Sequence, residues 1–313
     1  MRIFLAGATG VIGRPLVPRL VAQGHSVTGL VRRAADAEWL RGLGAEAVVG
    51  DVFDRDGVLG AVRRAAPEVV MHQLTDLKGG NFQANSEMRK TGTRHLVDAA
   101  LAAGVRRVVA QSIAWMYEAG EVPAAEDVPL DLGADGSRLR TVKGVAALEA
   151  AVREAPEWVV LRYGLLYGPG TWYARDGLMA ERAARGELAA DGDVSSFAHV
   201  YDAAGAAVAA LKWPTGAVNV CDDVPATGRE WVPVFCRAVG APDPAVAVPA
   251  DVAVLEFDQG PAVGLLAEVH LELAGARQVR VIDPDVSLPT APRIPPARTG
   301  TPAPSSGPCG HAR

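Results

Sequence analysis

The stretch Ile3-Phe4-Leu5-Ala6-Gly7-Ala8-Thr9-Gly10-Val11-Ile12-Gly13 decides the fold that this sequence predicts. Its first four residues are apolar and indicate a buried strand. Three glycines follow at three-residue spacing, and the apolar residues from Val11 to Ala22 then recur with helical periodicity. A strand, a glycine turn and a helix in this order form a cradle for phosphates, because the first N–H groups of the helix face the anion.

The glycines of this turn have different uses. One permits a tight turn, another lets the backbone approach a pyrophosphate, and Gly13 lets the helix pack closely on the strand. A glycine turn in an α/β protein without a ligand is the alternative, but the position after an N-terminal strand favours a dinucleotide. The residues that we expect to contact the cofactor here are Gly7, Thr9, Gly10, Val11, Ile12 and Gly13.

Composition excludes several classes of protein. The chain has 313 residues, of which 49% are hydrophobic and 21% charged, as in a globular protein. A net charge of -5 without a basic block argues against a nucleic-acid partner. The cysteines Cys221, Cys236 and Cys309 match no metal-binding spacing, so we expect no metal. We see neither a signal peptide nor a membrane span, and expect a cytoplasmic protein.

Strands and helices alternate along the chain, which predicts an α/β fold of the Rossmann type, with a doubly wound parallel sheet covered on both faces. The predicted strands are 26–31, 45–50, 68–73, 106–111, 158–162 and 217–220. The predicted helices are 54–65, 82–90, 91–103, 142–153, 177–185, 203–211 and 229–239. Ligands of such sheets bind beyond the carboxyl ends of the strands.

Arg32 and Arg33 end the second predicted strand, about 20 residues past the glycines. An acidic residue at this point would bond to the adenosine 2′-OH and select NAD, whereas a guanidinium suits a 2′-phosphate. The pair therefore predicts NADP(H) as the cofactor. Two loop arginines without a ligand are the alternative.

The sequence divides into three predicted regions. Residues 1–165 form the NADP-binding Rossmann domain, to which residues 190–221 return. Residues 166–189 and 222–282 form a smaller, C-terminal substrate-binding part. From 283 to 313 proline is frequent and apolar periodicity is absent, which predicts a disordered tail.

Several separated motifs occur in one order: the glycine turn, Gly50-Asp51-Val52, Thr91-Gly92-Thr93-Arg94, Leu161-Arg162-Tyr163-Gly164, Tyr167-Gly168-Pro169-Gly170 and His199-Val200-Tyr201-Asp202-Ala203-Ala204. In these motifs, as far as about Pro249, the chain resembles the extended short-chain dehydrogenase/reductases, which include NAD-dependent epimerase/dehydratase-like proteins. The resemblance implies that Asp51 and Val52 hold the adenine and that Leu74 and Thr75 flank the nicotinamide ribose. It also implies that the backbone from Tyr163 to Leu165 meets the nicotinamide end.

The same resemblance shows a departure at the catalytic motif. The family uses Tyr-x-x-x-Lys with a serine or threonine nearby. Here Lys143 matches the lysine, which implies that it holds the nicotinamide ribose, but Leu139 stands in the place of the tyrosine. Ser112 lies slightly off the usual serine register, with Ile113 nearer to it. Leucine carries no titratable proton, so the usual acid–base group is missing.

Three functions remain open on this basis. The first is an NADPH-dependent ketoreductase in which the proton comes from Ser112, Tyr117, water or a hydroxyl of the substrate itself. Its substrate is then an aromatic polyketide or similar polyphenolic ketone, because the chain resembles tyrosine-less ketoreductases of actinobacterial antibiotic pathways, angucyclinone pathways included. The second is an NADP-binding redox sensor or regulator that transfers no hydride. The third, an epimerase, dehydratase or cyclase, fits less well because those reactions also use the tyrosine.

Large side chains beside the expected cleft are candidates for binding a flat substrate, with ordinary core packing as the alternative. These candidates are Trp115, Met116, Tyr117, Tyr167 and Trp172. We expect His72 and His199 to be structural, and Asp202 to cap a helix that begins at Ala203. The sequence predicts no oligomeric state.

Overall fold

The computed structural model describes residues 1–75, 81–120 and 122–246. Within these residues, seven parallel strands form one sheet in the order β11-β6-β5-β4-β1-β2-β3. The strands are β1 (Arg2–Ala6), β2 (Ser26–Val31), β3 (Glu46–Val49), β4 (Val69–His72), β5 (Arg107–Ile113), β6 (Glu157–Tyr163) and β11 (Gly216–Val220). The order reverses next to β1, as in a doubly wound sheet. The predicted α/β fold is confirmed.

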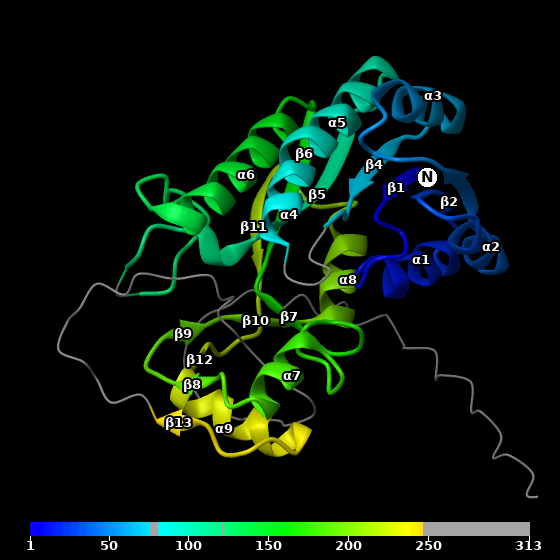
Figure 1. Cartoon of the computed structure of the whole chain (residues 1–313). Helices are drawn as coiled ribbons and strands as arrows, with labels where there is room; N and C mark the ends of the chain where they lie inside the picture. The colour runs from blue at the N-terminus through cyan, green and yellow to red at the C-terminus, as the bar shows by residue number, and fades with distance from the viewer. Residues whose placement is uncertain (76–80, 121, 247–313) are drawn as a thin grey trace, which may run out of the picture. The chain divides into compact units, whose positions relative to one another are not determined.

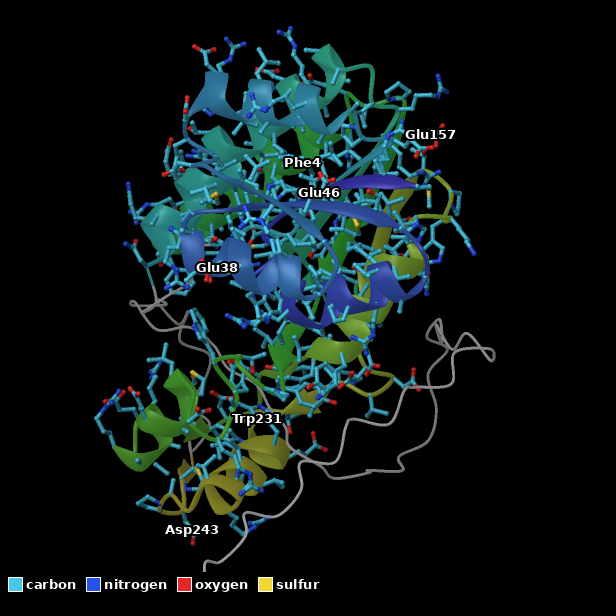
Figure 2. The ribbon with its side chains drawn as sticks, turned by 90° about the vertical axis from the view of Figure 1, so that its right-hand side faces the viewer. Phe4, Glu38, Glu46, Glu157, Trp231 and Asp243 are labelled. Atoms are coloured by element: carbon cyan, nitrogen blue, oxygen red, sulfur yellow. The ribbon has the colours of Figure 1, made fainter. Side chains whose placement is uncertain are left out.

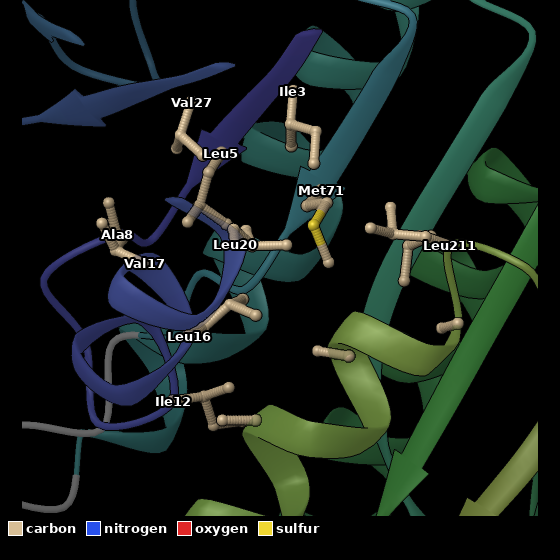
Figure 3. Packing of buried hydrophobic residues seen from close by; sticks show 14 of the residues in the cluster. Ile3, Leu5, Ala8, Ile12, Leu16, Val17, Leu20, Val27, Met71 and Leu211 are labelled. Atoms are coloured by element: carbon tan, nitrogen blue, oxygen red, sulfur yellow. The ribbon is translucent and has the colours of Figure 1, made fainter. Parts of the chain in front are cut away.

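Helices cover both faces of this sheet (Figure 1). One face carries α1 (Gly13–Ala22), α2 (Ala34–Gly42) and α8 (Val200–Ala209), and the other carries α3 (Arg55–Ala65), α5 (Thr93–Ala102) and α6 (Gly136–Val152). Side chains of β1 alternate between the two layers: Ile3 and Leu5 pack with α1, and Phe4 packs with α3 and α5. Figure 3 shows Ile3 and Leu5 beside Leu20 of α1. A strand buried on both faces explains the continuous apolar run at the N-terminus.

A second group of elements has its own core. It comprises β7 (Leu165–Tyr167), α7 (Leu178–Ala184), β8 (Ala189–Ala190), β9 (Val194–Ser195), β10 (Phe197–His199), β12 (Ala226–Thr227), α9 (Gly228–Val239) and β13 (Ala245–Val246). The strands pair as β10-β7, β12-β9 and β13-β8. Tyr173, Met179, Phe197, Trp231 and Phe235 pack together between them, and Figure 2 labels Trp231 in α9. Chain segments 200–209 and 216–220 belong instead to the large sheet and its cover.

The predictions for residues 247–282, as substrate-binding, and for 283–313, as a tail, lie outside the described residues. Some boundaries differ from those that the sequence predicts. Helix α2 was not predicted, because Ala37 and Leu40 are its main buried apolar residues and give little periodicity. Helix α6 begins at Gly136 rather than near Val142, which brings Leu139 and Lys143 onto one continuous helix.

Two further differences concern the starts of helices α8 and α5. Helix α8 begins at Val200, and the imidazole Nδ1 of His199 accepts the backbone N–H of Tyr201. Asp202 therefore lies inside the first turn, and the prediction that it caps the helix was wrong. Between α4 (Phe82–Glu87) and α5 the chain forms a π-helical turn, η2 (Met88–Gly92). Such turns are rare and often occur at functional sites.

Candidate functional site: a dinucleotide cradle at the carboxyl edge

The turn between β1 and α1 requires glycine at two positions. Gly7 has φ of 96°, and a Cβ there would lie 2.4 Å from the carbonyl oxygen of Gln73. A Cβ on Gly13 would lie 2.1 Å from the carbonyl oxygen of Gly7. Any side chain at either position would separate β1, β4 and α1, so the glycines keep the turn tight.

The beginning of α1 leaves donors free. Gly10 donates to the carbonyl of Gly7 at 3.0 Å, and Arg14 donates to Gly10 at 2.9 Å. In the described part of the chain the N–H groups of Val11 and Ile12 have no backbone acceptor. Free N–H groups at a helix start, next to a tight glycine turn, fit a pyrophosphate. The residues present therefore fit a dinucleotide.

Positive charge collects at the end of β2. Arg33 makes two hydrogen bonds to Asp36, Nε to Oδ2 at 2.7 Å and Nη2 to Oδ1 at 2.9 Å. These bonds hold the pKa of the Asp36 carboxyl below its usual range, and the charges of Arg14 and Arg32 add to the effect. Arg32 is exposed without a partner among the described residues, and Arg14 stacks over Trp39 at 5.0 Å. Arg33 is thus bonded to Asp36, whereas Arg32 has no such partner among the described residues.

Polar contacts hold the backbone that follows β3 and β4, at the carboxyl edge of the sheet. The carbonyl of Val52 accepts a hydrogen bond from His95 Nδ1 at 3.0 Å, and the Asp51 carboxylate accepts from the N–H of Phe53. The carbonyl of Leu74 accepts from Gln111 Nε2 at 2.7 Å, while Thr75 beside it is exposed. These contacts fix the backbone of the residues that the family resemblance assigns to the adenine and the nicotinamide ribose.

His72 and Arg89 are buried basic residues, and the charge of Arg89 acts on His72. The sequence predicts a structural role for His72 and indicates no role for Arg89. His72 is fully buried, and its Nδ1 accepts the N–H of Leu74 while its Nε2 lies 2.7 Å from the hydroxyl of Thr93. Burial, together with the charge of Arg89, lowers the pKa of His72 to about 4. His72 is therefore neutral at pH 7, in the structural role that the sequence predicts.

Lys143 and Leu139 lie one turn apart on α6. Lys143 is exposed and has no hydrogen-bond or ion-pair partner in the described segments. Leu139 is partly exposed on the same face, because residues four apart on a helix are neighbours. This face presents one free ammonium group and one apolar side chain.

The structure places the Ser112 and Tyr117 hydroxyls in a buried network. Ser112 is 1% exposed and donates to Glu149 Oε1 at 2.8 Å. The Tyr117 hydroxyl donates to Asn219 Oδ1 and accepts from Arg162 Nη1 at 2.9 Å. Burial raises the pKa of Tyr117, so the phenol keeps its proton. As both hydroxyls already donate inside the protein, neither is free to protonate a bound substrate.

The five proposed wall residues divide into two groups. Met116 is 1% exposed and packs with Ile113, Val142 and Val145, so it belongs to the core and its assignment to the substrate wall is corrected. Tyr117 is buried in the network above. Trp115 is 38% exposed, while Trp172 is partly exposed and packs edge-on against Phe82.

Tyr167 is also partly exposed, and its ring lies 5.0 Å from that of His199. Burial and the neighbouring Asp222 carboxylate raise the pKa of the Tyr167 phenol. The Tyr163 hydroxyl, by contrast, is buried and donates to the carbonyl of Ala203. Trp115, Tyr167 and Trp172 therefore keep part of their surface exposed, although Tyr167 and Trp172 also pack against the second core.

Residues 7–173 match a family model described as NAD(P)H-binding. The chain belongs to this NAD(P)H-binding family. It is 48% identical over 260 residues to the 3-diazoavenalumate denitrifying reductase of a Streptomyces species, a match that covers 78% of this chain and 83% of that one.

Solved structures agree with this assignment. The Bordetella bronchiseptica enzyme WbmG, in complex with NAD and UDP, is similar with a TM-score of 0.64 and 25% identity over 80% of this chain and 83% of that chain. The Thermus thermophilus UDP-glucose 4-epimerase, in complex with NAD, has a TM-score of 0.62 and 27% identity over 79% of this chain and 86% of that chain. The chain is an NAD(P)-dependent oxidoreductase with a Rossmann fold.

The described residues contain no group of three or more histidine, cysteine, aspartate or glutamate side chains that could hold a metal. In the same part of the chain, no helix has the length and apolar character that a membrane span needs.

Proposed function

We propose that this protein is an NADPH-dependent reductase that delivers hydride to an electrophilic aromatic substrate without donating a proton from a side chain. The observation that carries the proposal is the combination of an intact dinucleotide cradle with apolar residues at the acid–base positions. Leu139 stands one turn from Lys143, and Ile113 is buried among apolar side chains. The two hydroxyls that the sequence suggests as proton donors, those of Ser112 and Tyr117, donate to Glu149 and Asn219.

The proposed cofactor is NADPH rather than NADH. Arg32, at the end of β2, has no hydrogen-bond or ion-pair partner among the described residues, and the charges of Arg14 and Arg32 both act on the Asp36 carboxyl group. A free guanidinium at this position favours the 2′-phosphate of NADPH. When bound, the nicotinamide supplies the hydride, and this chain's residues then have to orient the substrate and exclude water.

For the substrate we favour an aromatic diazonium, in line with the name of the 48% identical relative. In this reaction the hydride supplies both electrons of a new C–H bond at the ring carbon. The C–N bond breaks, and N2 leaves with the electron pair of that bond. No proton is taken up, so a site without an acid is sufficient. The partly exposed aromatic side chains Trp115, Tyr167 and Trp172 suit a flat substrate.

The second candidate is the aromatic polyketide or polyphenolic ketone that the sequence suggests. Carbonyl reduction adds hydride to carbon and needs one proton on oxygen. Because Ser112 and Tyr117 are engaged, that proton would come from a hydroxyl next to the carbonyl on the substrate, or from water. An epimerase or dehydratase has less support, because Leu139 cannot act as a base.

The test is consumption of NADPH with two panels, aryl diazonium acids and hydroxylated aromatic ketones, using NADPH deuterated at the transferred position. Deuterium on an arene ring carbon, with release of N2, supports the favoured reaction. Deuterium on a carbinol carbon supports the ketone. Tight NADPH binding without turnover of either panel would favour the sensor. A Lys143→Met variant, which we expect to turn over more slowly, controls for reduction outside the site.

A further inference from the structure

Arg89 is a fully buried arginine that has no counter-ion among the described residues. The residue is 2% exposed, and its side chain is among the largest of those that are fully buried. Among the described residues no carboxylate lies within ion-pair distance of it, and its Nε has no hydrogen-bond acceptor. The other buried arginine near the site, Arg162, is instead bonded twice to Glu149.

Such an arrangement is unfavourable in the free protein. A guanidinium does not deprotonate in proteins, and a buried charge without a partner is strongly destabilising. Burial lowers the pKa of Arg89 to about 10, which still leaves the group charged at pH 7. A charge of this kind is satisfied when an anion binds beside it.

Arg89 lies near residues at the carboxyl edge of the sheet, where we expect the cofactor. It belongs to the π-helical turn η2, which packs on α6, the helix that carries Lys143. Its charge acts on His72, at the carboxyl end of β4. The last residue of the turn, Gly92, is so close to Val52 that a Cβ there would lie 3.1 Å from Cγ1. The turn thus lies between α6 and Val52, which follows β3 at the carboxyl edge of the sheet.

We propose that Arg89 binds an oxyanion of a ligand held in this cleft. The anion is either a phosphate of the dinucleotide or, on the basis of the function proposed above, a carboxylate of the aromatic substrate. Both present oxygen atoms that accept from a guanidinium in the same planar geometry. The rare π-helical turn is the local feature that allows a cation to be placed inside the layer between α6 and the sheet.

The experiment compares Arg89→Met, Arg89→Gln and Arg89→Lys with Lys90→Met, which removes a neighbouring charge that is exposed. We measure the melting temperature without ligand and the dissociation constant of NADPH by fluorescence titration. The same variants are titrated with 4-hydroxybenzoate and with its uncharged methyl ester. None of these measurements needs turnover, so they remain informative if the proposed reaction is wrong.

If Arg89 binds a phosphate, the neutral variants bind NADPH about tenfold more weakly or worse, Arg89→Lys loses less, and Lys90→Met is unchanged. If it binds a carboxylate, NADPH binding is unchanged and only 4-hydroxybenzoate, not the ester, binds more weakly. In either case the neutral variants melt at the same or a higher temperature without ligand, because an unpaired buried charge has been removed.

Two results would overturn the proposal. One is a folded Arg89→Met protein that binds NADPH and 4-hydroxybenzoate as tightly as the parent. The other is loss of folding in all three Arg89 variants, which would make the guanidinium a structural group.

Discussion

Arg162 and Glu149 form a doubly hydrogen-bonded ion pair inside the protein, with Nη2 to Oε2 at 2.7 Å and Nε to Oε1 at 2.9 Å. Both side chains are 3% exposed. The pair joins β6 to α6, and Arg162 Nη1 extends it to the Tyr117 hydroxyl and the carbonyl of Glu126. It therefore fastens the chain segment after β5, which carries Trp115, to the sheet.

Breaking this pair from one side is expected to be costly. Glu149→Leu leaves the Arg162 charge buried without its carboxylate, and we expect it to lower the free energy of unfolding by about 3 to 5 kcal/mol. The double variant Glu149→Leu with Arg162→Met removes both charges and should recover much of that loss. Urea denaturation of the parent, both single variants and the double variant gives the coupling energy. Additive effects of the two single substitutions would contradict this account.

Cofactor preference is expected to depend on Arg32 more than on Arg33, because Arg33 is already bonded to Asp36 while Arg32 has no partner among the described residues. Arg32→Asp should weaken NADPH binding by about 1.5 to 3 kcal/mol and move the preference toward NADH. Arg33→Ala, the matched control, should change NADPH affinity less. Titration of both coenzymes against both variants checks this. An equal loss of NADPH affinity in the two variants would contradict this prediction, because it would show that Arg33 contributes to NADPH binding in spite of its bonds to Asp36.

Much of the fold could be predicted from the sequence, because it follows from local patterns. The apolar run at 3–6, the glycine spacing and the alternation of strands and helices are all patterns that short windows of the sequence show. The buried charges could not be predicted in this way. Arg89, Glu149 and Arg162 look like surface residues in the sequence, since what buries them is contact between segments far apart in the chain.

The side-chain register of β5 explains why the sequence predicted an accessible hydroxyl at Ser112. Strand β5 extends to Ile113, and its residues Val108 and Ala110 face the layer that contains α5 and α6. With a period of two, Ser112 faces the same layer and meets Glu149 rather than the substrate. An expected strand end two residues too early was enough to predict an accessible hydroxyl where the structure has a buried one.

Stability should fall below about pH 6.5 through His72. The ordinary histidine pKa is 6.5, and in the folded protein that of His72 is lowered to about 4 by burial and by Arg89. Between these values the unfolded chain binds more protons than the folded one, so the free energy of unfolding rises with pH across this window and is fully recovered above it. The loss on acidification approaches about 3 kcal/mol by pH 4. Urea denaturation at several pH values should show a much smaller slope for His72→Gln, and an unchanged slope would contradict this assignment.

Removing the Tyr117 or Ser112 hydroxyl is expected to affect stability more than chemistry. Tyr117→Phe leaves Asn219 Oδ1 without its donor and Arg162 without one acceptor, which should cost about 1 to 3 kcal/mol of folding free energy. Turnover of a substrate that needs no protein proton should change by less than about tenfold in either Tyr117→Phe or Ser112→Ala, since a lost general acid removes about two to four orders of magnitude. Steady-state kinetics at a temperature well below the melting point, with NADPH affinity measured alongside, separate the two effects. Complete loss of turnover in either variant, with folding and cofactor affinity intact, would identify that hydroxyl as the proton donor and refute hydride transfer without protein acid catalysis.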